Sequence, residues 1–330
     1  MVLKRSLCYD CGMQSQEQIQ YPWGSELPYY SYAHYLKTKY GGRVQKVSIN
    51  AGFTCPNRDG KVAKGGCTFC NNKSFTPSYT RNGETIGEQV DRGISFLAKR
   101  YKRTKKFVGY FQAYTNTYAP LSELTALYEE ALKHPRLDGI VISTRPDCVS
   151  DELLDYLQDL SSRKIVVLEL GIESCYNDTL ERINRGHDFE TTVDAIHRAA
   201  GRGFHVGGHL LFGLPGDSRE KMLEQAEIIS GLPLDSIKFH QLQIVKGTVM
   251  AQQYREDASQ FNLFSKDEYI DFVIEFMARL RPDICVQRFI SEAPLDLRLA
   301  PNWGNFRSDV VMKEIEDKMK RQGVRQGMNF

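Results

Sequence analysis

The regular alternation of two kinds of segment constrains the fold of this 330-residue chain more than any other feature. From Gly42 onward, short runs of β-branched or aromatic residues alternate with longer segments in which apolar residues recur with helical period. Capping-box spacing of Asp217 with Glu220, and of Ser265 with Glu268, predicts where two of the helices begin. The predicted strands span residues 44–49, 107–111, 139–142, 165–170, 205–211 and 236–242, and the predicted helices span residues 86–100, 121–133, 151–160, 191–201, 218–229 and 266–280.

Strands that alternate with helices pair in parallel through right-handed crossovers. Such pairing gives an α/β fold, either an open doubly wound sheet or a barrel, and the pattern alone does not separate the two. In both architectures, ligands bind at the carboxyl ends of the strands. The residues that follow each predicted strand are therefore the candidates for a binding site.

Length and composition indicate one large domain of ordinary soluble type, with 41% hydrophobic and 25% charged residues. No apolar run approaches the roughly 20 residues that span a bilayer, and no apolar signal stretch follows the basic N-terminus. We therefore expect no membrane partner and a reducing, cytoplasmic location. In such a compartment, clustered cysteines are metal ligands or reactive thiols rather than disulfides.

The formal net charge of +2 gives no global indication of a polyanionic partner. Locally, residues 99–106 carry six positive charges. These residues could contact the phosphate backbone of an RNA. The favoured interpretation is that they end a helix, where cations suit the negative end of the helix dipole.

Three of the eight cysteines lie in one glycine-containing segment, residues 52–70, called the cysteine loop below. Cys55, Cys67 and Cys70 have the spacing Cys-x11-Cys-x2-Cys, and Gly60 permits the turn that brings Cys55 back. Iron–sulfur cubanes are normally held by four thiolates, so three at this range predict a [4Fe-4S] cluster with one iron lacking a protein ligand. Such an iron can bind a substrate or cofactor, and Phe69 would place an aromatic ring beside it.

Two other interpretations of the cysteine loop remain open, a structural zinc site and three unrelated buried thiols. Zinc requires a fourth ligand, and the loop contains no histidine, although Cys8 and Cys11 could supply thiolates from the N-terminus. Spacing favours the cluster without excluding zinc. A zinc-stabilised nucleic-acid-binding protein without catalytic activity is therefore one alternative function.

Two stretches of the cysteine loop, Cys-Pro-Asn-Arg-Asp-Gly at 55–60 and Gly-Gly-Cys-Thr-Phe-Cys at 65–70, resemble the radical S-adenosylmethionine (SAM) superfamily. The similarity is greatest to its YhcC/YtqA-type branch, which is related to the radical domain of the Elongator catalytic subunit. The resemblance implies a partial (β/α)6 TIM-like barrel over residues 41–285, an N-terminal extension over 1–40, and a C-terminal extension over 286–330 that packs on the barrel. It also implies that Cys55, Cys67 and Cys70 hold a [4Fe-4S] cluster, whose open iron binds the amino and carboxylate groups of SAM.

The segment after the second strand departs from the pattern of this family. Gln112, Ala113, Tyr114 and Thr115 stand where many members carry a glycine-rich segment that binds the methionine amino group of SAM. The resemblance assigns these four residues to SAM, although side chains replace the glycines.

The third strand leads into Ser143 and Arg145, within a Thr-Arg-Pro-Asp sequence that matches Elongator-like proteins. The resemblance assigns Ser143 to SAM and gives Arg145 a catalytic role. An arginine in this position can grip a carboxylate or phosphate through two hydrogen bonds. It could instead pair with Asp147 or Glu169 and only brace the barrel. Glu169 itself would be costly to bury without a partner or water.

Further SAM contacts follow from the resemblance at the next three strands. Glu173 would bind the ribose hydroxyls and Arg185 the carboxylate, although Glu173 could instead cap a helix. His209 would contact the nucleoside, although a lone histidine in an apolar strand is more often a satisfied core residue. Gln243 lies among alternating polar residues that are expected to face the ligand.

The resemblance implies an enzyme that cleaves SAM reductively to methionine and a 5′-deoxyadenosyl radical. A flavodoxin- or ferredoxin-type partner would supply the electron. Because the YhcC/YtqA-type branch is linked to maturation of the wobble-uridine side chain, the expected substrate is tRNA. The alternative within the same chemistry is a small-molecule, porphyrinogen-like substrate.

Overall fold

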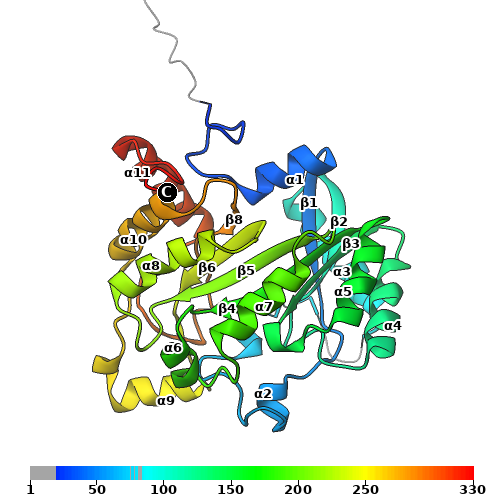
Figure 1. The fold of residues 1–330 in the computed structure, drawn as a ribbon, viewed down its shortest axis with the longest axis horizontal. Coiled ribbons are helices and arrows are strands. Elements are labelled where there is room, and N and C mark those ends of the chain that lie inside the picture. Colours follow the sequence, from blue (N-terminus) through cyan, green and yellow to red (C-terminus); the bar gives the residue numbers. More distant parts are fainter. Residues whose placement is uncertain (1–19, 75, 78, 81–83) are drawn as a thin grey trace, which may run out of the picture.

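The computed structural model describes residues 20–74, 76–77, 79–80 and 84–330, and it contains one seven-stranded parallel sheet (Figure 1). The strand order is β1-β2-β3-β4-β5-β6-β8, which leaves β1 and β8 at the two edges. A separate antiparallel pair joins β7 to β9. The strands are β1 (Arg43–Ile49), β2 (Thr104–Phe111), β3 (Leu137–Thr144), β4 (Ile165–Glu173), β5 (His205–Phe212), β6 (Ser236–Gln241), β7 (Ile244–Val245), β8 (Cys285–Arg288) and β9 (Arg298–Ala300).

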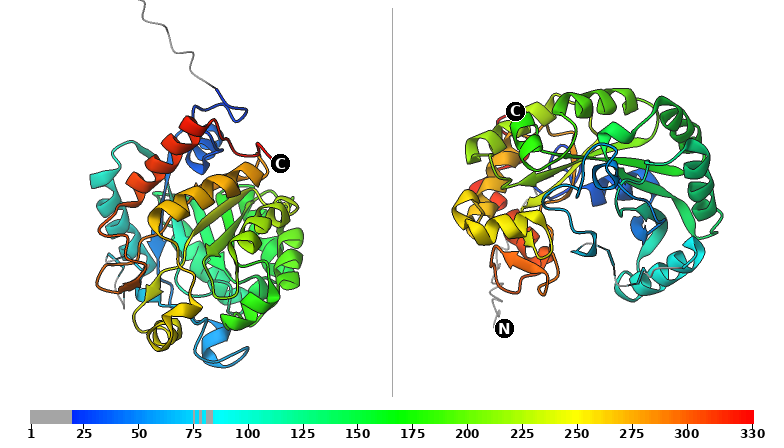
Figure 2. Two further views of the ribbon diagram at one scale, coloured as in Figure 1. Left: turned by 90° about the vertical axis from the view of Figure 1, so that its left-hand side faces the viewer. Right: turned by 90° about the horizontal axis from the view of Figure 1, so that it is seen from below.

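The sheet curls into a partial barrel, with helices arranged in an arc around its convex face (Figure 2). These helices form because each presents an apolar stripe to the sheet. On α5, for example, Leu153, Leu154, Leu157 and Leu160 are at most 1% exposed, and burial of each contributes about 1.5–3 kcal/mol. The outer helices are α3 (Ile86–Arg100), α4 (Leu121–Leu132), α5 (Asp151–Ser161), α7 (Phe189–Ala199), α8 (Arg219–Ser230) and α10 (Lys266–Arg279).

The remaining helices cap the two ends of the partial barrel. At the amino-terminal end of the sheet, α1 (Tyr32–Tyr40) contacts both edge strands, β1 and β8, and α11 (Ser308–Gln322) packs on α10 (Figures 1 and 2). At the other end lie α2 (Pro56–Asp59), α6 (Asn177–Arg182) and α9 (Val249–Glu256). The division into residues 1–40, 41–285 and 286–330 stays a prediction.

The predicted partial barrel and its six strands are confirmed, and β8 is a seventh strand that the sequence pattern did not reveal. The capping box of Ser265 and Glu268 is also confirmed. The one at Asp217 is wrong, because Ser218 caps α8. The Asp217 carboxylate instead accepts hydrogen bonds from the buried hydroxyls of Ser174 and Thr179.

None of the helices in the described part of the chain has the length and apolar character that a membrane crossing requires.

Candidate active site

A cavity of about 240 Å³ lies at the carboxyl ends of the strands, between the sheet and the cysteine loop. Ala113 does not line this cavity; it is buried beside a second, small cavity next to Ile49. All other site residues predicted from the sequence line the main cavity, namely Cys55, Cys67, Phe69, Cys70, Gln112, Tyr114, Thr115, Ser143, Arg145, Glu173, Arg185, His209 and Gln243.

The backbone of the cysteine loop brings its three thiols to one end of the cavity. Cys55 has extended backbone and precedes the short helix α2, which begins with Pro56 and ends at Gly60 in the left-handed region (φ 96°). The chain then returns, and Gly66 N donates a hydrogen bond to the carbonyl of Asn57 (2.7 Å). This geometry agrees with the turn that the sequence predicts at Gly60.

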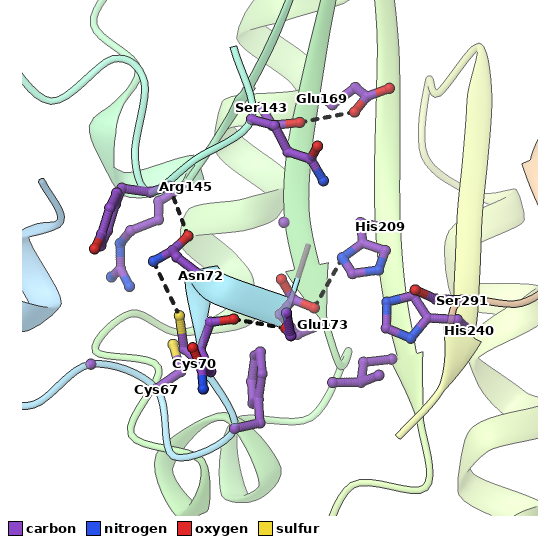
Figure 3. Close-up of a pocket in the computed structure, with 18 of the residues that line it drawn as sticks. Cys67, Cys70, Asn72, Ser143, Arg145, Glu169, Glu173, His209, His240 and Ser291 are labelled. Atoms are coloured by element: carbon purple, nitrogen blue, oxygen red, sulfur yellow. Dashed lines mark hydrogen bonds and ion pairs between the residues drawn. The ribbon is translucent and has the colours of Figure 1, made fainter. Parts of the chain in front are cut away.

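Nitrogen donors lie near two of the three sulfur atoms of the cysteine loop, and Figure 3 shows the contact of Asn72 with Cys70. Asn57 Nδ2 and Arg185 Nη1 each lie 3.6 Å from Cys67 Sγ, and Asn72 Nδ2 lies 4.0 Å from Cys70 Sγ. Burial raises the pKa of Cys70 to about 11, so the free thiol is protonated at neutral pH. A coordinated thiolate would be stabilised by these donors and by the metal, which fits an iron–sulfur cluster.

The arrangement of side chains does not support a site for a single metal ion such as zinc. Within residues 20–74, 76–77, 79–80 and 84–330, no three His, Cys, Asp or Glu side chains gather closely enough to hold one metal ion. A zinc site needs such a group because its ligands meet at one ion. In a cubane, each thiolate binds a different iron, so the cysteines need not converge. Cys8 and Cys11 lie outside the described residues.

The segment after α6 is joined to the cysteine loop through Asn184, a non-glycine residue in the left-handed region (φ 54°). Its amide Nδ2 donates to the carbonyl of Gly66 (2.8 Å), and its own carbonyl accepts from Asn57 Nδ2 (2.5 Å). Tyr114 and Glu173, which line the cavity, are also in the left-handed region, with φ 65° and 67°. Such conformations cost about 1–3 kcal/mol each and cluster at functional sites.

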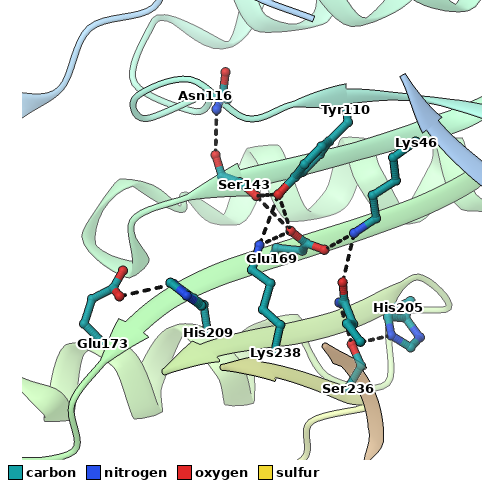
Figure 4. A network of polar contacts seen from close by, with 11 residues as sticks. Lys46, Tyr110, Asn116, Ser143, Glu169, Glu173, His205, His209, Ser236 and Lys238 are labelled. Atoms are coloured by element: carbon teal, nitrogen blue, oxygen red, sulfur yellow. Dashed lines mark hydrogen bonds and ion pairs between the residues drawn. The ribbon is translucent and has the colours of Figure 1, made fainter. Parts of the chain in front are cut away.

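Glu173, Arg185 and His209 form one interacting group, and Figures 3 and 4 show its Glu173–His209 contact. Glu173 Oε2 lies 3.1 Å from His209 Nδ1, and Glu173 Oε1 lies 3.9 Å from Arg185 Nη2. Arg185 also donates to the carbonyl of Gly171 (2.5 Å). A Cβ at Gly171 would lie 2.7 Å from Arg185 and 2.8 Å from Glu173, so only glycine leaves room for this arrangement.

The protonation states of Glu173 and His209 leave two hydrogen-bond acceptors for a ligand, the Glu173 carboxylate and His209 Nε2. Burial alone would raise the pKa of Glu173, but His209 and Arg185 outweigh burial and hold that pKa at about 2. Burial lowers the pKa of His209, so its ring is neutral, and Glu173 Oε2 is buried without a hydrogen-bond partner among the described residues. His209 Nε2 is buried and has no partner among the described residues. A carboxylate beside an unpartnered ring nitrogen fits the hydroxyl donors of a ribose.

Arg145 pairs with Asp147, which was one of the two carboxylates considered from the sequence. It is 3% exposed, and its guanidinium makes two hydrogen bonds to Asp147, Nε to Oδ1 at 2.9 Å and Nη2 to Oδ2 at 2.8 Å. It does not pair with Glu169 in the described structure. Its Nη1 is buried without a partner in that part of the chain, and therefore remains available for a ligand in the cavity.

A buried ionic network centred on Glu169 forms the floor of the cavity (Figure 4). Lys46 Nζ lies 2.5 Å from Glu169 Oε1, and Lys238 Nζ lies 2.6 Å from Oε2. Tyr110 and Ser143 donate their hydroxyls to the same carboxylate at 3.0 and 2.9 Å. Burial alone would raise the pKa of Glu169, but the two ammonium groups hold it well below its ordinary value. The expectation that Glu169 needs a partner is confirmed.

Sequence reasoning missed the side of the cavity that β8 and the following residues form. Arg288 and Ser291 line it, together with His240 at the end of β6. Gln243 lines the cavity too, but its amide binds protein: Nε2 donates to the carbonyl of Ser291 (2.6 Å), and Oε1 accepts from Ala293 N (2.9 Å). The one available signal was the polar pair Gln287-Arg288 at the end of a short apolar run.

The basic run at residues 99–106 lies at the other end of the sheet from the cavity. It connects the last turn of α3 to the first residues of β2, and Lys106 pairs there with Asp138 (Nζ to Oδ1, 3.2 Å). The cavity is formed by residues that follow the far end of β2. The helix-dipole interpretation of this run is therefore favoured, and the run does not border the cavity.

Family models match most of the described chain. The model described as the Radical SAM superfamily matches residues 52–229, and that described as the Radical_SAM C-terminal domain matches residues 234–321. YtqA of Bacillus subtilis (strain 168) is 34% identical over 308 residues, which cover 91% of this chain and 93% of YtqA. The tRNA uridine(34) acetyltransferase of Methanocaldococcus infernus is 29% identical over 156 residues, 46% of this chain and 28% of that protein.

Among solved structures, the archaeal Methanocaldococcus infernus Elp3 with an N-terminal deletion resembles this fold with a TM-score of 0.63. The two are 20% identical, and the match covers 86% of this chain and 64% of the Elp3 chain. At this level of identity, the likeness concerns the fold, and it agrees with the partial barrel described above.

Proposed function

The chain belongs to the radical SAM superfamily, and from this premise we propose that it holds a [4Fe-4S] cluster and SAM and modifies the wobble-uridine side chain of a tRNA. The expected resemblance to the YhcC/YtqA-type branch is confirmed. When bound, the cluster and SAM together supply a 5′-deoxyadenosyl radical. A flavodoxin- or ferredoxin-type protein in the cytoplasm is the proposed electron donor.

The observation that carries the proposal is that the three cysteines, Arg185 and the Glu173–His209 pair share one cavity. Cys55, Cys67 and Cys70 would hold the cluster at one end. Arg185, within 3.6 Å of Cys67 Sγ, is placed to meet a carboxylate bound beside the cluster. Glu173 and His209 would then accept hydrogen bonds from the ribose hydroxyls, because Glu173 Oε2 and His209 Nε2 are both buried without a partner among the described residues.

Two observations support RNA as the substrate class. One is the relative described as tRNA uridine(34) acetyltransferase. The other is a set of exposed lysines around the cavity, here called the rim lysines: Lys61, Lys64, Lys73 and Lys246. The first two belong to the cysteine loop, and the carbonyl of Lys246 accepts a hydrogen bond from the cavity residue Asn71 (2.8 Å). Exposed cations at a mouth favour a phosphate backbone.

Removal of the gene from its source organism is expected to change the nucleosides of bulk tRNA. Mass spectrometry of digested tRNA should show loss of one modified uridine and accumulation of its precursor. The wild-type gene should restore the profile, and a Cys70→Ala gene should not. An unchanged profile in the deletion strain would contradict the tRNA proposal.

Charge reversal at the rim is expected to weaken tRNA binding. The double variant Lys61→Glu/Lys64→Glu should bind bulk tRNA on the order of tenfold less tightly at low salt, and its affinity should depend less steeply on salt concentration. The matched control is Lys102→Glu/Lys105→Glu, which makes the same charge change in the basic run at the other end of the sheet. Equal losses in the two variants would show that the rim lysines have no special role.

A further inference from the structure

The cationic side chains that line the cavity differ in whether they have a negative partner. Arg145, Arg185 and Lys238 each lie within 3.9 Å of a carboxylate oxygen. Arg58 donates to the carbonyl of Cys70 (3.1 Å), beside the thiols of the cysteine loop. Arg288 is the exception, because in the described part of the chain its side chain has neither a carboxylate oxygen within 4.0 Å nor a hydrogen-bond partner, and its Nε is buried.

The acidic side chain nearest to Arg288 in sequence has another partner. Glu292 also lines the cavity, but its Oε1 accepts hydrogen bonds from the backbone N and the hydroxyl of Ser308, at the beginning of α11. The described residues therefore leave Arg288 without an ion pair. A half-buried guanidinium without an anion is unfavourable, and cavities in which such groups persist are candidates for anion binding.

Arg288 lies away from the cysteines. It is the last residue of β8 and the register partner of Lys238 on β6. Figure 3 shows His240 and Ser291, which belong to this side, across the cavity from Cys67 and Cys70. A SAM carboxylate bound beside Arg185 would be on the cysteine side. The anion that Arg288 lacks therefore belongs to a second ligand.

His240 adds a directional group next to this position. Its Nδ1 lies 3.0 Å from the carbonyl of Gln241, and because a carbonyl only accepts, Nδ1 carries the proton. Burial lowers the pKa of His240 well below its ordinary value, so the ring is neutral and Nε2 is an acceptor. This side of the cavity thus offers a guanidinium fork for an anion and a ring acceptor for an N–H or O–H group.

We infer that Arg288 binds a carboxylate or phosphate group of the substrate, on the side of the cavity opposite the cluster cysteines. The inference rests on the proposed function, because it assigns the cysteine side to SAM. The anion can belong to the nucleobase or to the nucleic-acid backbone. A planar guanidinium matches either group through two parallel hydrogen bonds.

The test uses the cluster-reconstituted, SAM-bound enzyme and titration calorimetry with three ligands. Uridine 5′-monophosphate carries a phosphate, 5-carboxyuridine carries a carboxylate on the base, and uridine carries neither. Arg288→Gln should weaken binding of one anionic ligand at least tenfold and leave uridine binding unchanged. Arg288→Lys keeps the charge but not the fork, and should show a smaller loss. The ligand that is affected identifies the source of the anion.

Two outcomes overturn the inference. One is that Arg288→Gln binds both anionic ligands as tightly as the wild type does. The other is that neither anionic ligand binds the wild type more tightly than uridine does. Unchanged SAM affinity and melting temperature in the variants exclude misfolding, and Arg288→Lys alone suffices if Arg288→Gln does not fold. If instead the proposed radical SAM function is wrong, the wild-type enzyme itself will release no 5′-deoxyadenosine from SAM when a chemical reductant is added. This measurement separates failure of the proposed function from failure of the inference about Arg288.

Discussion

Replacement of Cys55, Cys67 or Cys70 by alanine is expected to abolish the iron–sulfur cluster and, with it, SAM cleavage. Loss of an outer-shell partner of a metal site costs about 10- to 100-fold in affinity or activity. Loss of one of only three protein ligands should cost more. Anaerobic purification, iron and sulfide analysis, and visible absorbance would measure the cluster. Release of 5′-deoxyadenosine would measure activity.

The matched control for these variants is Cys175→Ala. Cys175 is a buried free thiol near the start of α6 and does not line the cavity, so its loss should leave iron content and SAM cleavage unchanged. A cysteine-loop variant that retained wild-type iron and activity would contradict the assigned ligand set. A colourless wild-type protein that carried zinc and no iron would contradict it as well.

Glu169→Gln is expected to lower the free energy of unfolding by about 3–5 kcal/mol, the range for breaking a buried ion pair. The Glu169 side chain is 1% exposed and those of Lys238 and Lys46 are 10% and 25% exposed. An amide in place of the carboxylate leaves two ammonium groups without a negative partner and directs an N–H₂ group toward them. Urea-induced unfolding at neutral pH would measure the loss.

The pH dependence of this loss provides a further check. Because the pKa of Glu169 lies below its ordinary value of 4.5 in the folded protein, its stabilisation is complete above that value and declines as the pH falls through the folded pKa. The difference between wild type and Glu169→Gln should therefore be constant near neutrality and narrow only in acid. Asp317→Asn, which breaks the exposed Lys313–Asp317 pair on α11, should leave stability unchanged. If the two substitutions lowered the free energy of unfolding equally, the buried network around Glu169 would contribute no more to stability than an exposed ion pair.

The parts of the site that sequence predicts well are those that depend on short-range signals. The cysteine loop is one continuous segment, and its spacing favoured an iron–sulfur cluster over zinc, while the resemblance of its motifs implied the SAM chemistry. Glu173 follows the predicted strand 165–170, and His209 lies in the second half of the predicted strand 205–211. Parallel pairing then brings the ends of those strands together, so their shared cavity was predictable without knowledge of any contact.

The parts that sequence did not predict depend on contacts between distant segments. Four residues are too few for a period, so β8 and Arg288 gave no clear signal. Arg145 pairs with Asp147, and Glu169 pairs with two lysines. Several charged residues could have paired with each in sequence, and only the three-dimensional structure shows which ones do. The basic run was ambiguous because a cluster of positive charges suits both the end of a helix and a phosphate backbone. Gln243 was correctly expected at the cavity, although its amide binds the protein backbone.

The open edges of the sheet determine what sets the width of the active site. The width of a closed barrel is fixed by its strand number and stagger. In the described structure no backbone pairing joins β1 to β8, and the hydrogen bond from Lys46 Nζ to Gln287 Oε1 (2.9 Å) is a side-chain contact between them. The helix α1 also contacts both strands at the amino-terminal end. The width of the opening between β1 and β8 is therefore set by side-chain and loop contacts rather than by a closed ring of backbone hydrogen bonds.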